Sequence, residues 1–246
     1  MGEFTQYDVT EGIATITLDN PDKLNAYNTV MGDEVVALLR GAMEDDAVRV
    51  VILTGAGRGF CAGVDLDHLK AHEAGGNASK GPKLGEEDFL RKMPSEMMEA
   101  PKPIIAAING PAVGVGMTMV LPCDIRIAAE GAKLGLAFAR LGILPGLGST
   151  HVLPRLVGMA KAQELVLTAK NILAEEAAEI GLVNKVVPGD ELMATAREMA
   201  LQIAGNEPEV VRFAKRVLYE GAGLGMTDAM LNEQGRSEEL RKARGK

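Results

Sequence analysis

The first two hydrophobic segments of the chain alternate apolar and polar residues, at Tyr7–Val9 and Ile13–Leu18. A period of two is typical of β-strands with one buried face. The dipeptide Glu11-Gly12 separates the two segments, and glycine tolerates the positive φ that a two-residue turn requires. We therefore predict a β-hairpin near the start of the chain.

Three later segments are apolar almost throughout, and they lie at Val48–Leu53, Pro103–Ile108 and Asp124–Ala128. Such runs are typical of strands that are buried on both faces of a sheet. Segments with helical periodicity precede them, at Thr29–Met43, Glu87–Glu99 and Val115–Leu121. Alternating strands and helices favour parallel strands joined by crossovers, so the pattern predicts an α/β fold.

After Leu153 the pattern becomes mainly helical. Five segments have helical periodicity: Ala160–Thr168, Ala174–Ile180, Glu191–Ala204, Pro208–Glu220 and Thr227–Lys242. We expect a core over residues 1–190 and a helical C-terminal region over residues 191–246. A Gly-rich stretch between the predicted elements, Ala71–Gly85, has few apolar anchors and is predicted to be a surface loop.

Composition narrows the functional classes. A chain of 246 residues, 47% of them hydrophobic, is long enough to bury a substantial core. Its net charge of −8 and its lack of a basic stripe argue against binding to nucleic acid. Two cysteines, Cys61 and Cys123, imply no disulfide framework. The longest apolar run, Pro111–Leu121, is far shorter than the roughly 20 residues that cross a bilayer. We expect a cytoplasmic protein without a membrane segment.

Two Gly-rich turns, Gly55–Asp65 and Asn109–Gly116, each follow a predicted buried strand. A strand that ends in glycines and leads into a helix leaves backbone N–H groups unpaired, so two such turns together would form an anion-binding site. The alternative is that the glycines only permit close packing. Dinucleotide binding is a weaker alternative: Gly57–Ala62 fits G-x-G-x-x-A, but Asn77–Pro82 lacks the acidic residue that would follow.

Three segments carry a specific resemblance: Asp19–Ala26, Gly59–Leu66 and Lys102–Gly114. In this order and spacing the chain resembles the enoyl-CoA hydratase/isomerase, or crotonase, family, and the string Gly-Pro-Ala-Val-Gly is nearest to Δ3,Δ2-enoyl-CoA isomerases. The resemblance implies an α/β spiral of β-β-α units with a helical C-terminal trimerisation region. It also implies a homotrimer or a hexamer built as a dimer of trimers. The expected ligand is an acyl-CoA thioester, with coenzyme A as part of the substrate and no separate cofactor.

The resemblance also assigns residues to a site. The backbone N–H groups of Val64 and Val115 would form an oxyanion hole for the thioester oxygen and stabilise an enolate. The rest of the ligand would lie near a set of residues in the first two matching segments: Lys23, Leu24, Ala26, Ala62, Asp65 and Leu66.

The chain departs from the family where proton transfer takes place. Thr118 and Phe138 occupy the two positions at which family hydratases have glutamates, and Gly146 occupies the position of the isomerase carboxylate. None of the three is a general base near neutral pH, although all three are expected to line the substrate site. His68 is the best substitute, because histidine titrates near neutrality. Other candidates are Asp67, His72, Glu73, Glu86, Glu87 and Asp88, and the acids among them are expected to be solvated.

Three functions stay open at this stage. The first is an enoyl-CoA hydratase/isomerase-type lyase or isomerase with atypical acid/base residues. The second is a non-catalytic acyl-CoA-binding subunit, and the third is a hydrolase or decarboxylase that uses His68. We expect no metal site, because His72-Glu73 lacks the second histidine of H-E-x-x-H. The methionines of the central region are expected to fill the core or a pocket: Met93, Met97, Met98, Met117 and Met119.

Overall fold

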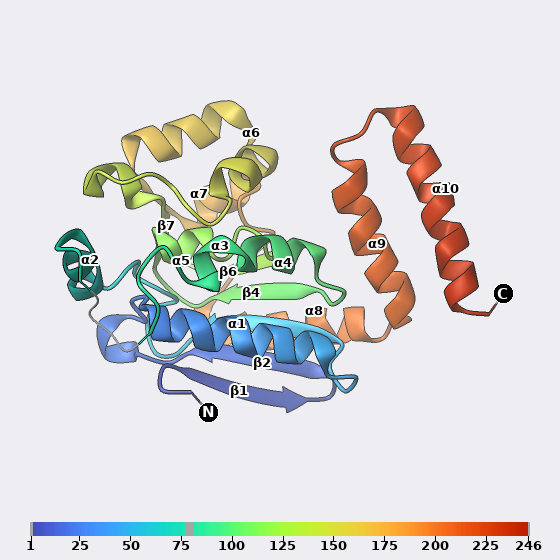
Figure 1. Ribbon diagram of the computed structural model, residues 1–246, viewed down its shortest axis with the longest axis horizontal. Coiled ribbons are helices and arrows are strands. Elements are labelled where there is room, and N and C mark those ends of the chain that lie inside the picture. Colours follow the sequence, from blue (N-terminus) through green and yellow to red (C-terminus); the bar gives the residue numbers. More distant parts are fainter. Residues whose placement is uncertain (1, 77–80, 246) are drawn as a thin grey trace.

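The computed structural model describes residues 2–76 and 81–245. Its main feature is a six-stranded sheet in the order β1-β2-β3-β4-β6-β9, with a three-stranded sheet β5-β7-β8 beside it (Figure 1). The strands of the large sheet are β1 (Thr5–Thr10), β2 (Ile13–Leu18), β3 (Val50–Gly55), β4 (Ile104–Ile108), β6 (Ile125–Ala129) and β9 (Lys185–Val187). Those of the small sheet are β5 (Ala112–Val113), β7 (Lys133–Gly135) and β8 (Asn171–Leu173).

The hairpin and the parallel sheet are confirmed. β1 pairs antiparallel with β2, and both turn residues have positive φ, 53° at Glu11 and 76° at Gly12. Every other pair in the large sheet is parallel. The connections between these parallel strands contain helices, which place the loops that follow β3 and β4 at one edge of the sheet.

Both faces of the sheet are buried, and this explains the continuous apolar runs. Along β3, Val51 and Leu53 pack into the larger core cluster, whereas Val50 and Ile52 pack into the smaller one. Successive side chains point to opposite faces of a strand, so a strand covered on both sides needs apolar residues at every position.

α1 packs on one face of the sheet and α8 on the other, in the larger and the smaller core cluster. The helices are α1 (Thr29–Glu44), α2 (Leu66–Glu73), α3 (Asp88–Arg91), α4 (Met93–Glu99), α5 (Val115–Thr118), α6 (Ser149–Thr168), α7 (Ala174–Glu179), α8 (Leu192–Ala204), α9 (Pro208–Gly221) and α10 (Met226–Ala243). Three short 3-10 helices are η1 (Pro21–Lys23), η2 (Ala137–Leu141) and η3 (Gly189–Glu191). α6 is kinked at Gly158, whose φ is 76°. No helix of the described residues combines the length and apolar character needed to cross a membrane.

Two of the predicted helices are wrong in extent. The segment Glu87–Glu99 forms two helices, α3 and α4, instead of one. Pro94 lies in the first turn of α4, where its ring and missing N–H cannot continue a preceding helix. The helix expected over Val115–Leu121 is limited to α5. Of the predicted loop Ala71–Gly85, residues 77–80 lie outside the described part of the chain.

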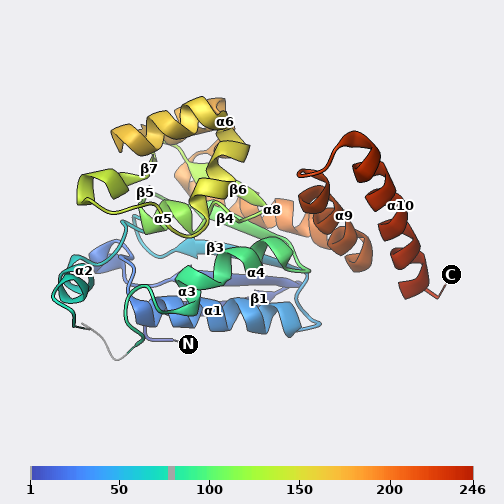
Figure 2. The ribbon, with the colours of Figure 1, turned by 45° about the horizontal axis from the view of Figure 1, so that its top comes forward.

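The C-terminal helices differ in their environment. α8 covers one face of the sheet, since Leu192, Ala196 and Ala200 belong to the smaller core cluster. α9 and α10 stand together at the opposite end of the molecule from α2 (Figures 1 and 2). The buried Lys215 attaches α9 to the core, because its Nζ donates to Asp124 Oδ2 at 2.9 Å and to the Met97 carbonyl at 2.8 Å. The division at residue 190 stays a prediction.

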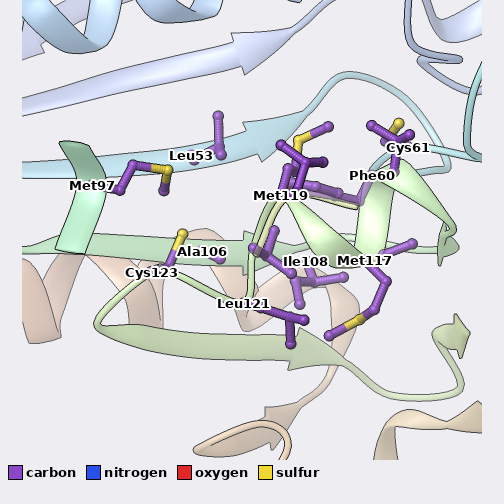
Figure 3. Close-up of a cluster of buried hydrophobic side chains, with 14 of the residues drawn as sticks. Leu53, Phe60, Cys61, Met97, Ala106, Ile108, Met117, Met119, Leu121 and Cys123 are labelled. Atoms are coloured by element: carbon purple, nitrogen blue, oxygen red, sulfur yellow. The ribbon is translucent and has the colours of Figure 1, made fainter. Parts of the chain in front are cut away.

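The methionines fill the interior, as expected. Met97, Met117 and Met119 are at most 2% exposed, and they pack with Leu53, Ile108 and their neighbours between the sheet and the helices (Figure 3). A flexible thioether side chain adapts to the irregular space beside the Gly-rich turns. The buried methionines and their neighbours thus form the part of the core that lies next to the Gly-rich turns.

Candidate active site

The two Gly-rich turns lie against each other and are joined by backbone hydrogen bonds. The N–H of Cys61 donates to the Pro111 carbonyl at 3.0 Å, and the N–H of Val113 donates to the Cys61 carbonyl at 3.0 Å. A Cβ added at Gly116 would lie 2.1 Å from the Cys61 oxygen. Close packing, one of the two roles considered for the glycines, is therefore a requirement of the second turn.

Two glycines shape the backbone at the junction. Gly63 has a φ of 111°, and Gly114 has a φ of 56° with a ψ of −118°. Residues other than glycine rarely adopt these backbone angles. Each is followed by a valine, Val64 or Val115. The two unusual conformations orient the peptide planes that carry these valine N–H groups.

Two asparagines that the sequence reasoning missed hold the first turn in place. Asn25 is fully buried, and its Nδ2 donates to the carbonyls of Ala56 and Gly59 at 3.0 and 2.8 Å. Asn109 Nδ2 donates to the Gly57 carbonyl at 2.9 Å. Both asparagines belong to the segments that carry the family resemblance, so their position was a usable signal for a supporting role.

In the described part of the chain, the N–H groups of Val64 and Val115 have no hydrogen-bond acceptor. Within the described residues, neither donates a hydrogen bond to a backbone or side-chain acceptor. The neighbours of Val64 are fixed, because Tyr27 accepts from the Asp65 N–H at 2.8 Å and donates to the Gly63 carbonyl at 2.7 Å. Val64 is thus held between two bonded residues with its own N–H left free.

A cavity of about 760 Å³ lies over these two amides. Its wall contains ten of the twelve residues that the sequence analysis assigned to the oxyanion hole, the substrate site and the candidate base: Lys23, Ala26, Ala62, Val64, Asp65, Leu66, Val115, Thr118, Phe138 and Gly146. Leu24 is not in the wall, but its carbonyl accepts from the Ala62 N–H at 3.0 Å. His68, on α2, is not in the wall either.

The mouth of the cavity carries an ion pair. Lys23 Nζ lies 2.7 Å from Asp65 Oδ2 and 3.6 Å from Asp67 Oδ2. Burial raises the pKa of Asp65, but the hydrogen bond and the charge of Lys23 outweigh it and hold the pKa below its usual value. Asp65 Oδ1 also accepts from the Asp67 N–H at 2.9 Å, which caps the first turn of α2.

The inner part of the cavity is apolar. Thr118 is fully buried, Phe138 is 6% exposed and Leu147 is 3% exposed, and the Thr118 hydroxyl donates to the Val115 carbonyl at 3.3 Å. A Cβ added at Gly146 would meet no atom within 4 Å. Among the described residues of the wall, the carboxylates are Asp65 and Asp67, and both are paired with Lys23.

The expectation of solvated acids is wrong for Glu87. Its side chain is 1% exposed, and Oε1 accepts a hydrogen bond from the Tyr27 hydroxyl at 2.7 Å. Asp67 and Glu86 are exposed as expected, and the side chain of Glu73 lies outside the described part of the chain. The described residues contain no group of three potential metal ligands.

Comparison with known proteins gives consistent matches. A sequence model of the enoyl-CoA hydratase/isomerase family matches residues 8–239. The short-chain-enoyl-CoA hydratase of Clostridium acetobutylicum is 43% identical over 213 residues, 85% of this chain and 78% of that protein. The 1,2-epoxyphenylacetyl-CoA isomerase of Escherichia coli K12 is 39% identical over 204 residues, 83% of this chain and 77% of that protein.

A solved structure agrees with these relatives. The enoyl-CoA hydratase from Bacillus anthracis superimposes with a TM-score of 0.85 at 38% identity, over 96% of this chain and 90% of that one. The expected crotonase-like α/β fold is thereby confirmed, whereas the matches give no support to the dinucleotide-binding alternative. The chain belongs to the enoyl-CoA hydratase/isomerase family.

Proposed function

We propose that the N–H groups of Val64 and Val115 bind the carbonyl oxygen of an acyl-CoA thioester and stabilise the enolate that forms from it. The observation that carries the proposal is that neither N–H group has an acceptor among the residues the structure describes, and that both residues line one cavity. Oxygen takes up negative charge as an enolate forms, so fixed donors stabilise that state more than the substrate. One such donor contributes about 2.7–4 kcal/mol in known enzymes.

The reaction we propose is hydration or double-bond isomerisation of an enoyl-CoA, the activities for which the family is named. Thr118, Phe138 and Gly146 supply no general base, so the proton is moved by another group. His68, on α2, remains the side-chain candidate named from the sequence, although it does not line the cavity as the structure has it. The proposal requires no cofactor besides the coenzyme A portion of the substrate.

The test is incubation with crotonyl-CoA and with longer 2-enoyl- and 3-enoyl-CoAs. Loss or gain of the absorbance of the conjugated thioester reports hydration or isomerisation, and mass spectrometry identifies the product. We expect turnover of at least one of these thioesters. If none is turned over, the hydratase and isomerase assignments are wrong.

A second candidate is a non-catalytic acyl-CoA-binding subunit. The observation that favours it is that both carboxylates in the described wall of the cavity, Asp65 and Asp67, are paired with Lys23. Calorimetry separates this candidate from the enzyme. Tight binding of an enoyl-CoA without turnover supports the binding subunit, whereas absence of binding contradicts both.

The proposal includes assembly into a homotrimer or a hexamer. α9 and α10 expose large apolar side chains, with Leu218 at 74%, Met226 at 79% and Leu231 at 60%. Such a surface is typical of one that another chain covers. Light scattering on the purified protein is expected to give three or six times the mass of one chain, and a monomer at micromolar concentration would contradict this part of the proposal.

A further inference from the structure

Tyr27 connects the oxyanion turn to a segment that is distant in sequence. Its backbone pairs with the residues on either side of Val64, as an isolated parallel bridge. Its side chain is fully buried. The hydroxyl donates to Glu87 Oε1 at 2.7 Å, and the ring stacks on Phe89 with 4.5 Å between centroids. Tyr27 therefore contacts the Val64 turn through its backbone, and through its side chain it contacts residues 84–90, the segment that leads into α3.

The segment of residues 84–90 forms part of the cavity wall. Leu84 and Leu90, on either side of Glu87 and Phe89, line the cavity and pack against the main core. By contrast, Leu66, Leu141 and Leu144 line the same cavity but are 58%, 45% and 88% exposed. Leu84 and Leu90 thus belong to its more enclosed part, where an apolar acyl group would be removed from water.

We propose that Tyr27 and Glu87 form a positioning pair that holds the Leu84–Leu90 wall at the turn carrying Val64, and so gives the site its preference for longer apolar acyl groups. The inference rests on the proposed function, because it assigns part of the cavity to the acyl portion of the ligand. Tyr27 and Glu87 do not line the cavity. They act through the leucines and are not catalytic residues.

Loss of either side chain removes the hydrogen bond between Tyr27 and Glu87 and leaves the polar group of the other residue buried without that partner. Glu87 Oε2 already has no hydrogen-bond partner among the described residues, so the Tyr27 hydroxyl supplies the side-chain hydrogen bond of the buried carboxylate. Burial, followed by the charge of Glu87, raises the pKa of Tyr27 far above its usual value. Removing both polar groups together avoids leaving a buried carboxyl group without a hydrogen-bond partner.

The experiment compares Tyr27→Phe with the double variant Tyr27→Phe/Glu87→Leu. Calorimetry measures the Kd of the unreactive thioesters butyryl-CoA and octanoyl-CoA. We expect the wild-type protein to bind octanoyl-CoA at least about tenfold more tightly, since each buried methylene favours binding. The single variant should melt roughly 5–10 °C lower. The double variant should recover most of its stability but lose most of the octanoyl-to-butyryl preference.

The matched control is Tyr219→Phe. Tyr219 is on α9, outside the cavity wall, and its hydroxyl donates to Asp124 Oδ1 at 3.3 Å, so its loss should leave the preference unchanged. A double variant that regains both stability and preference would overturn the proposal, because the pair would then be only structural. Binding of neither thioester by the wild-type protein would overturn the proposed function itself.

Discussion

The mouth of the cavity carries charged side chains, whereas the side chains of its interior are uncharged. At the mouth, Lys23 is paired with Asp65 and Asp67, and the Lys23 and Asp67 side chains are 53% and 76% exposed. In the interior, Thr118 and Phe138 are buried and uncharged. Solvated charges suit a charged ligand group, whereas an apolar interior strengthens the two free amides by lowering the local dielectric. The cavity therefore has stronger features for ligand binding than for proton transfer.

The largest change to this difference would come from a carboxylate added at Gly146, an exposed residue of the cavity wall. Gly146 has open space at its Cβ position, and its φ lies outside the left-handed region, so Gly146→Asp should fold. A correctly placed acid or base contributes about 10²–10⁴-fold. We expect the variant to gain isomerisation of 3-enoyl-CoA on this scale, followed by the absorbance of the conjugated product.

Gly146→Asn is the matched control, because it has the same shape without a titratable carboxylate. Equal rates for the two variants would mean that the cavity lacks more than a base. The proposed oxyanion hole would then lie in the wrong place for the α-carbon protons of the substrate.

The next largest effect would come from moving one of the free amides. A Cβ at Gly63 would lie 3.2 Å from the Val113 oxygen, in a backbone with φ of 111°. Gly63→Ala should therefore shift the Val64 N–H and lower kcat/KM by about 10²–10³-fold, the usual effect of losing an oxyanion donor.

Gly131→Ala is the control for backbone strain. Gly131 also has positive φ, 68°, but an added Cβ meets nothing within 4 Å. Thermal unfolding should show a similar loss of stability in both variants, with activity lost only in Gly63→Ala. Normal activity in Gly63→Ala would contradict the role given to the Val64 amide.

A smaller effect is expected at the mouth, where two substitutions change the charge in opposite directions. Lys23→Met should weaken binding of a CoA thioester and Asp67→Asn should strengthen it, each by about twofold to fivefold at low salt, the usual contribution of one exposed charge pair. Both shifts should nearly vanish at 1 M salt, where the Debye length is about 3 Å. Calorimetry at two salt concentrations measures them.

Lys242→Met, on α10 and exposed, is the control for net charge and should have no effect. Shifts that persist at high salt would indicate that Lys23 acts by packing or by a direct contact, and not through the electrostatic field at the mouth.

A structural feature was predictable from the sequence when the residues that form it are close together in the chain, and not when they are far apart. Local patterns were sufficient for the hairpin at Glu11-Gly12 and for β3. The break between α3 and α4 was also readable, since Pro94 is incompatible with a continuous helix. The burial of Glu87 was not, because charged side chains are mostly exposed and its partner Tyr27 is 60 positions away.

The candidate site also has features that were predictable from the sequence and features that were not. The Gly-rich turns were identifiable as sources of free amides, and the family resemblance assigned Val64 and Val115. The contacts that make the turns rigid were not identifiable. Asn25 and Asn109 bond to carbonyls of the first turn across 31 to 52 positions, and no local pattern specifies which carbonyls an asparagine side chain will meet.

The smallest predicted effect concerns the pH dependence of stability at the mouth. The pKa of Asp65 is held below its usual value in the folded protein, with Lys23 outweighing burial. A depressed carboxyl pKa stabilises the fold at pH values above the unfolded pKa, about 3.9, and this contribution is lost as the pH falls through the folded pKa. In the variant Asp65→Asn, the amide oxygen would still accept the Asp67 N–H as a helix cap, so the substitution removes mainly the charge.

We therefore expect the melting temperatures of the wild-type protein and of Asp65→Asn to differ by a constant amount above about pH 4 and to converge below it. Melting curves between pH 7 and pH 2 measure this convergence. A difference that stays constant down to pH 2 would mean that Asp65 stabilises the mouth through its shape and its cap alone. The contrast between a charged mouth and an uncharged interior would then have no consequence for the stability of the fold.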